Sequence, residues 1–370
     1  MALTKAGTNE NTKAGAEIGP TDDDIAENAA LAMILEVSSF PKPGNVHRLR
    51  DFKDTAYEQF LASAVAAGTV FGRAAKAART HEYGAGAMIE AAVERSIRRQ
   101  SGGNTHFGTF VLLIPLVMGA AAVSETERKT ASDPENITAS DPENIAERIA
   151  GAAGKICRKT TACDAEAFYR AFAASGAAVQ KDPEGTFDLT DPAAVSRIAD
   201  SGKTLAALME EAAGRDLVAA EWVNGFEKTK AFRKRLARHE EYMAHRTAHG
   251  TVHRNISESN RDPVAKSRIC TAVVVTFAEF LASVPDTFIA SKHDQKAADD
   301  VCAKAAAILE ECGFDPAGKE TAYDEDAVIR LCKRLDVLDD EMHRNGHNPG
   351  SLADICAAGL FLYLAGGRRL

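Results

Sequence analysis

The stretch IAENAALAMILEVSSFPKPGNVHRLR, residues 25–50, contains the two features that decide the fold. Its first half is apolar on nearly every face of a helix and predicts a buried central helix, with Thr21 and Asp24 as the capping signal ahead of it. Its second half leaves the helix, because Pro41 and Pro43 bias the residues before them towards extended geometry. The residues after this break are unusually polar and basic. The stretch predicts a helical protein whose chemistry lies in the loops between helices.

The rest of the chain repeats the helical pattern. Helices are predicted at about 55–78, 87–100, 107–123, 216–246, 269–284, 294–311, 324–343 and 351–365. Alanine is conspicuous, aromatic residues make up only 6%, and no hairpin signal or strand–helix–strand rhythm occurs. We predict an all-α fold in which a flexible lead-in, residues 1–20, precedes one large helical catalytic domain, residues 21–370. Its active site should be built from loops at helix ends.

The charge balance limits the partners. The 370 residues include 44 Lys and Arg against 53 Asp and Glu, which gives a net charge of −9. A coat protein for nucleic acid, or a binder of anionic membranes, would need a basic surface. The apolar run from Phe107 to Val123 contains Pro115 and internal glycines, which favours a buried core helix over a membrane span. We therefore expect small-molecule substrates, with no nucleic acid and no membrane.

Cysteine usage and the N-terminus indicate the compartment. The seven cysteines include no C-x-x-C pair, so we expect reduced and mostly buried thiols. The first 20 residues lack the apolar core of a signal peptide. Both observations favour a cytoplasmic protein, and a homo-oligomer is left open.

One segment repeats itself. The octapeptide TASDPENI occurs twice in tandem, at residues 130–137 and 138–145. A tandem copy without a longer repeat pattern is typical of a slippage duplication. We expect a surface loop insertion at about 124–145.

Four loop segments carry the candidate functional residues. In the first, Glu36 ends an apolar helix, where burial and the negative helix end disfavour a carboxylate. It is either a site carboxylate or the partner of Lys42 or Arg48 in a structural salt bridge. Basic side chains in this loop can cradle phosphates, or the loop can be simply a solvated basic segment, and Asn45 can contact a hydroxyl group.

The other three segments lie further along the chain. Residues 102–106 present backbone N–H groups at a helix start, which attract anions, although glycine loops also serve as plain connections. Residues 286–293 hold Asp, Lys and His in one short loop, which ordinary turn chemistry also explains. Residues 348–354 end with Ser351 and Asp354 at capping-box spacing, so capping is the alternative to a binding role there.

The sequence contains none of the usual nucleotide or metal signatures. The P-loop, dinucleotide-binding and hydrolase-elbow patterns are missing. His47, His106 and His293 lack the spacing of zinc ligands. Carboxylates together with a substrate phosphate suit Mg²⁺ better, because this ion prefers oxygen ligands.

The four segments together, in this order, resemble the triphosphoribosyl-dephospho-CoA synthase family. The matching residues are Glu36-Val37 with Pro41-Lys42-Pro43-Gly44, Asn104-Thr105-His106 with Gly108, Asp286-Thr287 with Lys292-His293, and Asn348-Pro349-Gly350-Ser351 with Asp354. They span most of residues 30–365. The resemblance implies an all-helical enzyme that transfers the triphosphoribosyl unit of ATP to the ribose 2′-hydroxyl of dephospho-CoA and releases adenine.

This reaction implies specific chemical needs. Positive charge develops at the ribose C1′ and needs a carboxylate, the acceptor hydroxyl needs a base, and the triphosphate needs Mg²⁺ and cations. We expect the catalytic carboxylates among Glu36, Asp51 and Asp286, and magnesium ligands in Asp54 and Asp354, although the sequence does not rank the five. Substrate binding is expected from Lys42, Gly44, Asn45, His47, Arg48, Asn104, Thr105, His106, Lys292, His293, Asn348, Gly350 and Ser351. ATP is the expected donor substrate and Mg²⁺ the expected cofactor.

The chain also departs from the family pattern. It has Pro43-Gly44-Asn45-Val46-His47 where the family continues Pro-Gly-Leu-Val-Asp, so a histidine replaces a carboxylate. It has Gly350-Ser351-Leu352 where the family often has Gly-Gly-Ser. These differences bear on the identity of the acceptor, dephospho-CoA, more than on the pentosyl transfer itself. Two alternatives follow: transfer to a different cofactor precursor, such as a methanopterin-type side chain, and a non-catalytic helical nucleotide-binding protein.

Overall fold

The computed structural model describes residues 19–368, except 53, 83, 131–141, 178–190, 192, 249–266 and 320–323. Helices make up nearly all of its regular structure, and within these residues the only β-bridge pairs His47 with Arg50. The helices are α1 (Asp22–Ser38), α2 (Tyr57–Arg79), α3 (Ala85–Ile97), α4 (Phe107–Thr130), α5 (Pro142–Arg158), α6 (Ala162–Ser175), α7 (Ala194–Ser201), α8 (Leu205–Ala212), α9 (Leu217–Val223), α10 (Glu227–Ala248), α11 (Arg268–Ser283), α12 (Thr287–Lys292), α13 (Gln295–Cys312), α14 (Glu325–Asn345) and α15 (Gly350–Ala365). The predicted all-α fold is confirmed.

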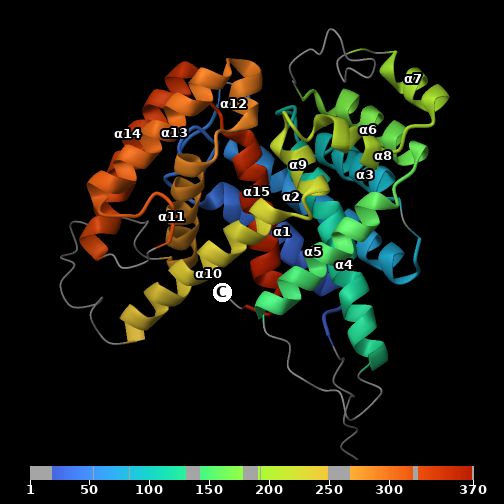
Figure 1. Ribbon diagram of the computed structural model, residues 1–370, viewed down its shortest axis with the longest axis horizontal. Helices are drawn as coiled ribbons and strands as arrows, with labels where there is room; N and C mark the ends of the chain where they lie inside the picture. The colour runs from blue at the N-terminus through green and yellow to red at the C-terminus, as the bar shows by residue number, and fades with distance from the viewer. Residues whose placement is uncertain are drawn as a thin grey trace, which may run out of the picture.

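The last helix lies at the centre of the molecule. Figure 1 shows α15 in the middle, with α11, α13 and α14 on one side and α3, α6, α7 and α8 on the other. Residues 355–364 of α15 are all buried, and α15 packs against α1, α4 and α10. The apolar residues on every face of α15 explain this position, because each face meets a neighbouring helix. The first and last helices of the chain therefore share one core.

Helix α4 is the long apolar helix predicted around Phe107. By length and composition it could cross a membrane, but 83% of its most apolar 18-residue window is buried inside the protein. Its residues Leu112, Leu113 and Ile114 are fully buried. It therefore serves as a core helix here, with Pro115 accommodated inside it.

Several predicted helix ends are found, and one predicted helix is divided. The capping box at the start of α1 is present, since the Thr21 hydroxyl accepts from the Asp24 N–H at 3.1 Å. The predicted helix 216–246 is two helices, because residues 225 and 226 adopt left-handed backbone angles between α9 and α10. The Glu221 carboxylate accepts from the N–H groups of residues 228 and 229 and so starts α10. The predicted start at Asp262-Pro263 lies outside the described residues, and Ser267 is the N-cap of α11.

The predicted insertion loop is shorter than expected. Helix α4 continues to Thr130 and α5 begins at Pro142, so residues 124–130 and 142–145 are helical. The remainder, 131–141, lies outside the described residues, as do residues 1–18 of the predicted lead-in. At the first described residues, the Pro20 carbonyl accepts from Arg79 Nη2 at 2.9 Å.

Candidate functional site at converging helix ends

The loop after α1 is held in place by one buried carboxylate, Asp339 of α14. Its Oδ1 accepts from the Gly44 N–H at 2.8 Å and lies 3.0 Å from His343 Nδ1. Its Oδ2 pairs with Arg50 Nε at 2.8 Å and with His47 Nε2 at 3.2 Å. Burial acts to raise the pKa of Asp339, but the hydrogen bonds from His343 and His47 hold it well below its usual range. Asp339 is thus an ionised anchor for the loop.

These contacts give two loop residues a structural role. His47 is fully buried, its Nε2 faces Asp339, and its Nδ1 accepts from the Leu49 N–H at 3.3 Å. Both ring nitrogens are engaged within the protein, so His47 positions the loop, and its predicted contact with a substrate stays a prediction. Gly44 also has a structural role, because its φ is +77° and a Cβ there would collide with the His347 carbonyl.

Glu36 and Lys42 form a buried ion pair beneath this loop. The Lys42 ammonium contacts the Glu36 carboxylate and donates to the Glu36 carbonyl at 3.1 Å. Both side chains are almost fully buried, and burial lowers the pKa of Lys42 to about 8. Of the two salt bridges that the sequence left open for Glu36, the one to Lys42 is present. Arg48 is half-buried and has no ion pair among the described residues.

His106 lies next to this pair at the start of α4. Its Nδ1 is 2.9 Å from the Ser63 hydroxyl, which is 2.8 Å from the Ser96 hydroxyl. Its Nε2 is buried without a hydrogen-bond partner. Burial and the nearby Lys42 charge lower the pKa of His106 to about 3, so the ring is neutral at physiological pH. A buried ring nitrogen without a partner is a candidate substrate contact.

Asp286 joins the starts of two helices. Its Oδ1 accepts from the N–H groups of Phe288 and Ile289, at 2.8 and 3.0 Å, and its Oδ2 accepts from the Leu352 N–H at 2.8 Å. The carboxylate therefore caps α12 and α15 together. Both oxygens are engaged with the backbone, which gives Asp286 a positioning role, and the catalytic role that the sequence suggested for it stays a prediction.

Ser351 does not cap α15 as its spacing suggested. Its hydroxyl lies 3.0 Å from the Thr287 hydroxyl, which accepts from the Leu217 N–H at 3.1 Å. The N-cap position of α15 is Pro349, without a side-chain cap. The hydroxyl pair thus links α15 and α12 to the start of α9, where Asp216 accepts from the Ala219 N–H at 2.7 Å.

Asp354 connects α15 to α4. Its Oδ1 accepts from the Thr109 hydroxyl at 2.6 Å, and a Cβ on Gly108 would collide with its Oδ2. The N-terminal ends of α4, α9, α12 and α15 therefore meet in one region, and helix N-termini attract anions. Burial raises the pKa of both Asp354 and Asp286 to about 7. Repulsion from Asp216 adds to the rise at both groups, and repulsion from Asp286 adds to it at Asp354. The capping explanation for Asp354 is wrong, because it bonds across to another helix.

Some predicted residues lie at the edges of this region. The Asn104 side chain accepts from the Phe107 N–H at 3.0 Å and caps α4, and the Thr105 hydroxyl is 3.4 Å from that of Ser96. The Asn348 side-chain oxygen is buried without a partner. Gly350 lies against Phe288, where an added Cβ would come within 3.0 Å of the ring.

Other predicted residues do not point to a common role. Asp51 is exposed and accepts from the Tyr57 N–H at 2.8 Å at the start of α2, and its catalytic role stays a prediction. Asp54 is exposed. Its negative charge acts to raise the pKa of Lys292, but the burial of Lys292 has the larger effect and lowers that pKa. Lys292 lies 4.1 Å from the Phe288 ring. His293 contacts the Gly346 carbonyl at 3.2 Å, and Asn45 is buried with its amide 3.4 Å from the Pro43 carbonyl.

Three residues of this region were missed from the sequence. Thr109 and Asp216 look like ordinary helix-start residues, and only the packing of α4, α9 and α15 brings them together. Asp339 had a usable signal, since Leu335, Leu338 and Met342 form the buried stripe of α14 and Asp339 lies within it. A carboxylate at a core position needs a hydrogen-bonding or charged partner, because burial of an unpaired charge costs free energy.

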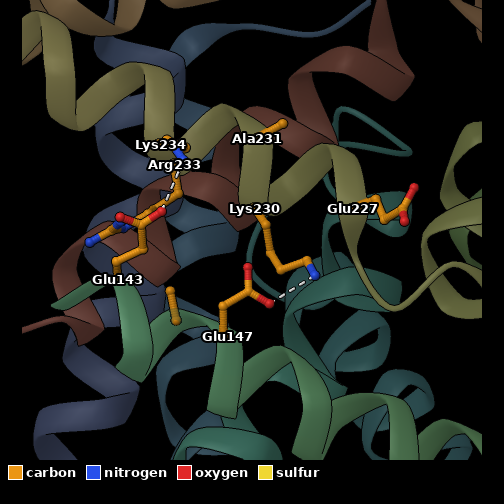
Figure 2. A pocket seen from close by; sticks show the side chains of 8 residues that line it. Glu143, Glu147, Glu227, Lys230, Ala231, Arg233 and Lys234 are labelled. Atoms are coloured by element: carbon orange, nitrogen blue, oxygen red, sulfur yellow. Dashed lines mark hydrogen bonds and ion pairs between the residues drawn. The ribbon is translucent and has the colours of Figure 1, made fainter. Parts of the chain in front are cut away.

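A separate hollow of about 370 Å³ lies between α5 and α10. Figure 2 shows the acidic residues of α5 opposite the basic residues of α10. Lys230 pairs with Glu147 at 3.0 Å, and Lys234 with Glu143 at 3.1 Å. Its charges are thus matched within the chain, and none of the predicted site residues lines it.

Known proteins share this architecture. The ATP:dephospho-CoA triphosphoribosyl transferase family model matches residues 22–369. A crystal structure from Archaeoglobus fulgidus, provisionally described as a triphosphoribosyl-dephospho-CoA synthase, is similar with a TM-score of 0.54 and 24% identity, covering 85% of this chain and 100% of that one. The search of curated proteins finds no match. The structural likeness supports the fold, and the family match covers nearly the whole chain.

An all-α fold in which helix N-termini and a buried lysine meet at one polar cluster defines a helical enzyme for phosphorylated small molecules. Within that class, the chain belongs to the ATP:dephospho-CoA triphosphoribosyl transferase family. The family reaction is the transfer of the triphosphoribosyl unit of ATP to dephospho-CoA, and this protein is a triphosphoribosyl transferase.

Proposed function

We propose that triphosphoribosyl transfer to the ribose 2′-hydroxyl of dephospho-CoA takes place at the cluster of Glu36, Lys42, His106 and Asp354. The convergence of four helix N-termini on this cluster supports the proposal more than any other observation. The partial positive charge of these helix ends, in a buried setting, suits a triphosphate, which carries several negative charges.

In this proposal each residue of the cluster has one task. Glu36, kept next to the Lys42 ammonium, faces the positive charge that develops at C1′ when the bond to adenine breaks. Lys42 and the helix starts hold the triphosphate. The unpartnered Nε2 of His106 bonds to a substrate hydroxyl, which a neutral ring can do as donor or acceptor.

Magnesium fits this cluster as a companion of the substrate. The described residues include no group of three side chains that could hold a metal ion by themselves. Asp354 has its Oδ2 beside Gly108, and a cation would favour its ionised form, which burial disfavours. We propose that Asp354 and the ATP phosphates hold the Mg²⁺, which neutralises phosphate charge. Exposed Asp54 lies apart and is a weaker candidate ligand.

The proposed acceptor is dephospho-CoA, the acceptor of the family reaction. The histidine that replaces a family carboxylate at position 47 faces Asp339 and the loop, so it gives no argument for a different acceptor. None of the seven cysteines forms a disulfide in the described part of the chain and five of them are buried, which supports the proposal of a cytoplasmic enzyme.

Adenine release tests the proposed function. Purified protein is incubated with ATP, Mg²⁺ and dephospho-CoA, and free adenine is measured by chromatography. We expect adenine in proportion to product, and at least a 100-fold loss in Glu36→Gln and His106→Ala with unchanged helical circular dichroism. Exposed Glu58→Gln is the matched control and should retain full activity.

Three outcomes separate the alternatives. Adenine release only with a pterin-type ribosyl acceptor would favour the second acceptor class. ATP binding without adenine release from folded protein would favour a non-catalytic nucleotide-binding protein. Full activity in Glu36→Gln would remove Glu36 from the reaction.

A further inference from the structure

A hollow of about 340 Å³ lies where α2 meets the C-terminal end of α3. It is lined by Ala66 of α2, by Arg95 of α3, and by Arg98 and Arg99, which directly follow α3. The three guanidinium groups are exposed, and the hollow falls in the size range of small-molecule sites, roughly 300 to 1,000 Å³. None of these residues belongs to the cluster described above.

The positive charge here exceeds what the helix end requires. Arg98 pairs with Glu94 at 3.1 Å, but Arg95 and Arg99 have no carboxylate partner among the described residues. A helix C-terminus carries only about half a negative charge. Two guanidinium groups therefore remain uncompensated in a chain whose net charge is −9. Paired guanidinium groups bind phosphate oxygens through forked hydrogen bonds.

The turn that carries the arginines is linked to the proposed active site. Ser96, in this turn, is buried and bonds to Ser63, whose hydroxyl bonds to His106. Directly after this turn, Gln100 donates to the Gly103 carbonyl at 2.8 Å and so fixes the loop that leads to Asn104. The arginines and three predicted substrate ligands, residues 104–106, therefore belong to one hydrogen-bonded segment of the chain.

We propose that the hollow formed by Arg95, Arg98 and Arg99 binds the phosphate chain of a nucleotide substrate at the edge of the active site. The proposal rests on the proposed function for the identity of the nucleotide. The chemistry that the hollow recognises is an oligophosphate, which either the ATP triphosphate or the dephospho-CoA diphosphate can supply.

Calorimetric binding measurements test the hollow and its source of phosphate. The full chain is titrated separately with ATP, dephospho-CoA and inorganic tripolyphosphate, as wild type and as the Arg95→Gln/Arg99→Gln double variant. The control double variant, Arg73→Gln/Arg330→Gln, removes the same charge from exposed arginines without ion pairs among the described residues. We expect the first double variant to weaken tripolyphosphate and one nucleotide on the order of tenfold, and the control to stay within twofold.

The nucleotide that weakens identifies the substrate whose phosphates lie in the hollow, and its KM should rise with little change in kcat. The proposal is overturned if all three ligands bind the two double variants equally, or if the wild type binds none of them. The two proposals can fail separately. If the protein releases no adenine but the arginine variant still loses tripolyphosphate binding, phosphate binding in the hollow is supported and only the proposed function is contradicted.

Discussion

At the scale of single residues, Asp339 organises the loop that the site needs. One buried carboxylate accepts from the Gly44 backbone and pairs with His47, Arg50 and His343. The sequence predicted a functional loop after α1 but could not show which acidic residue of α14 would meet it. That choice depends on how α14 rotates against the core, which only packing decides.

Replacing Asp339 should therefore destabilise the protein. In Asp339→Ala a buried charge network loses its centre, and we expect a fall of about 3 to 5 kcal/mol in the free energy of unfolding. Urea unfolding followed by circular dichroism measures it. Asp340→Ala is the control, since Asp340 is 56% exposed and contacts Arg50 only, so its cost should stay below about 1 kcal/mol. Equal losses in the two variants would contradict the anchoring role.

At the scale of elements, the sequence predicted most helices, but it did not predict which helix starts come together at the site. Apolar periodicity and capping signals located most helix starts within a few residues, because both are local. The spacing of Ser351 and Asp354 suggested a local capping box, but Asp286 supplies the cap from 66 residues away. Long-range capping leaves no local pattern, so the sequence could not show that Asp286 caps α15.

Removal of this shared cap should cost more than removal of an ordinary one. Asp286→Ala leaves three N–H groups at the starts of α12 and α15 without acceptors, and we expect a loss of about 3 kcal/mol in unfolding free energy. Asp294→Ala removes a single exposed cap of α13 and should cost about 1 kcal/mol. Thermal unfolding of both variants compares them, and a smaller loss in Asp286→Ala would contradict the double cap.

The duplicated octapeptide offers a test of a connection. Helices α4 and α5 pack against each other, and α4 ends at Thr130 while α5 begins at Pro142. Deleting residues 130–137 leaves a four-residue link, and helix–helix connections of about 2 to 8 residues are common. We expect adenine release to stay unchanged and the unfolding free energy to shift by less than about 1 kcal/mol. A large loss of either would show that the repeat contributes to the fold or the site.

At the scale of the whole molecule, two buried carboxyl groups of the site reduce the stability of the fold. Asp286 and Asp354 both have pKa values raised to about 7, far above that of an unfolded carboxyl group. Between about pH 4 and pH 7 the folded protein binds protons that the unfolded chain has released, so these groups make stability fall as pH rises. The lowered pKa of Asp339 acts in the opposite direction, but only below about pH 4.

Asp354→Asn should reverse part of this cost. The neutral side chain keeps the hydrogen bond from Thr109 without the buried charge. We expect the variant to be more stable than wild type at pH 8 by about 1 to 3 kcal/mol and nearly equal at pH 5, while adenine release falls. Urea unfolding at the two pH values measures the difference. A variant that loses equal stability at both values would show that the carboxylate is purely structural.

The packing of the first helix against the last has a consequence during synthesis. Helix α15 lies at the centre of the molecule and packs against α1, α4 and α10. While the ribosome is still making the chain, α1, α2 and α4 can pack against one another, but the faces of α1 and α4 that α15 covers have no partner until residue 365 emerges. A nascent chain of this kind exposes hydrophobic surface late into translation, which makes it dependent on chaperones and sensitive to C-terminal truncation.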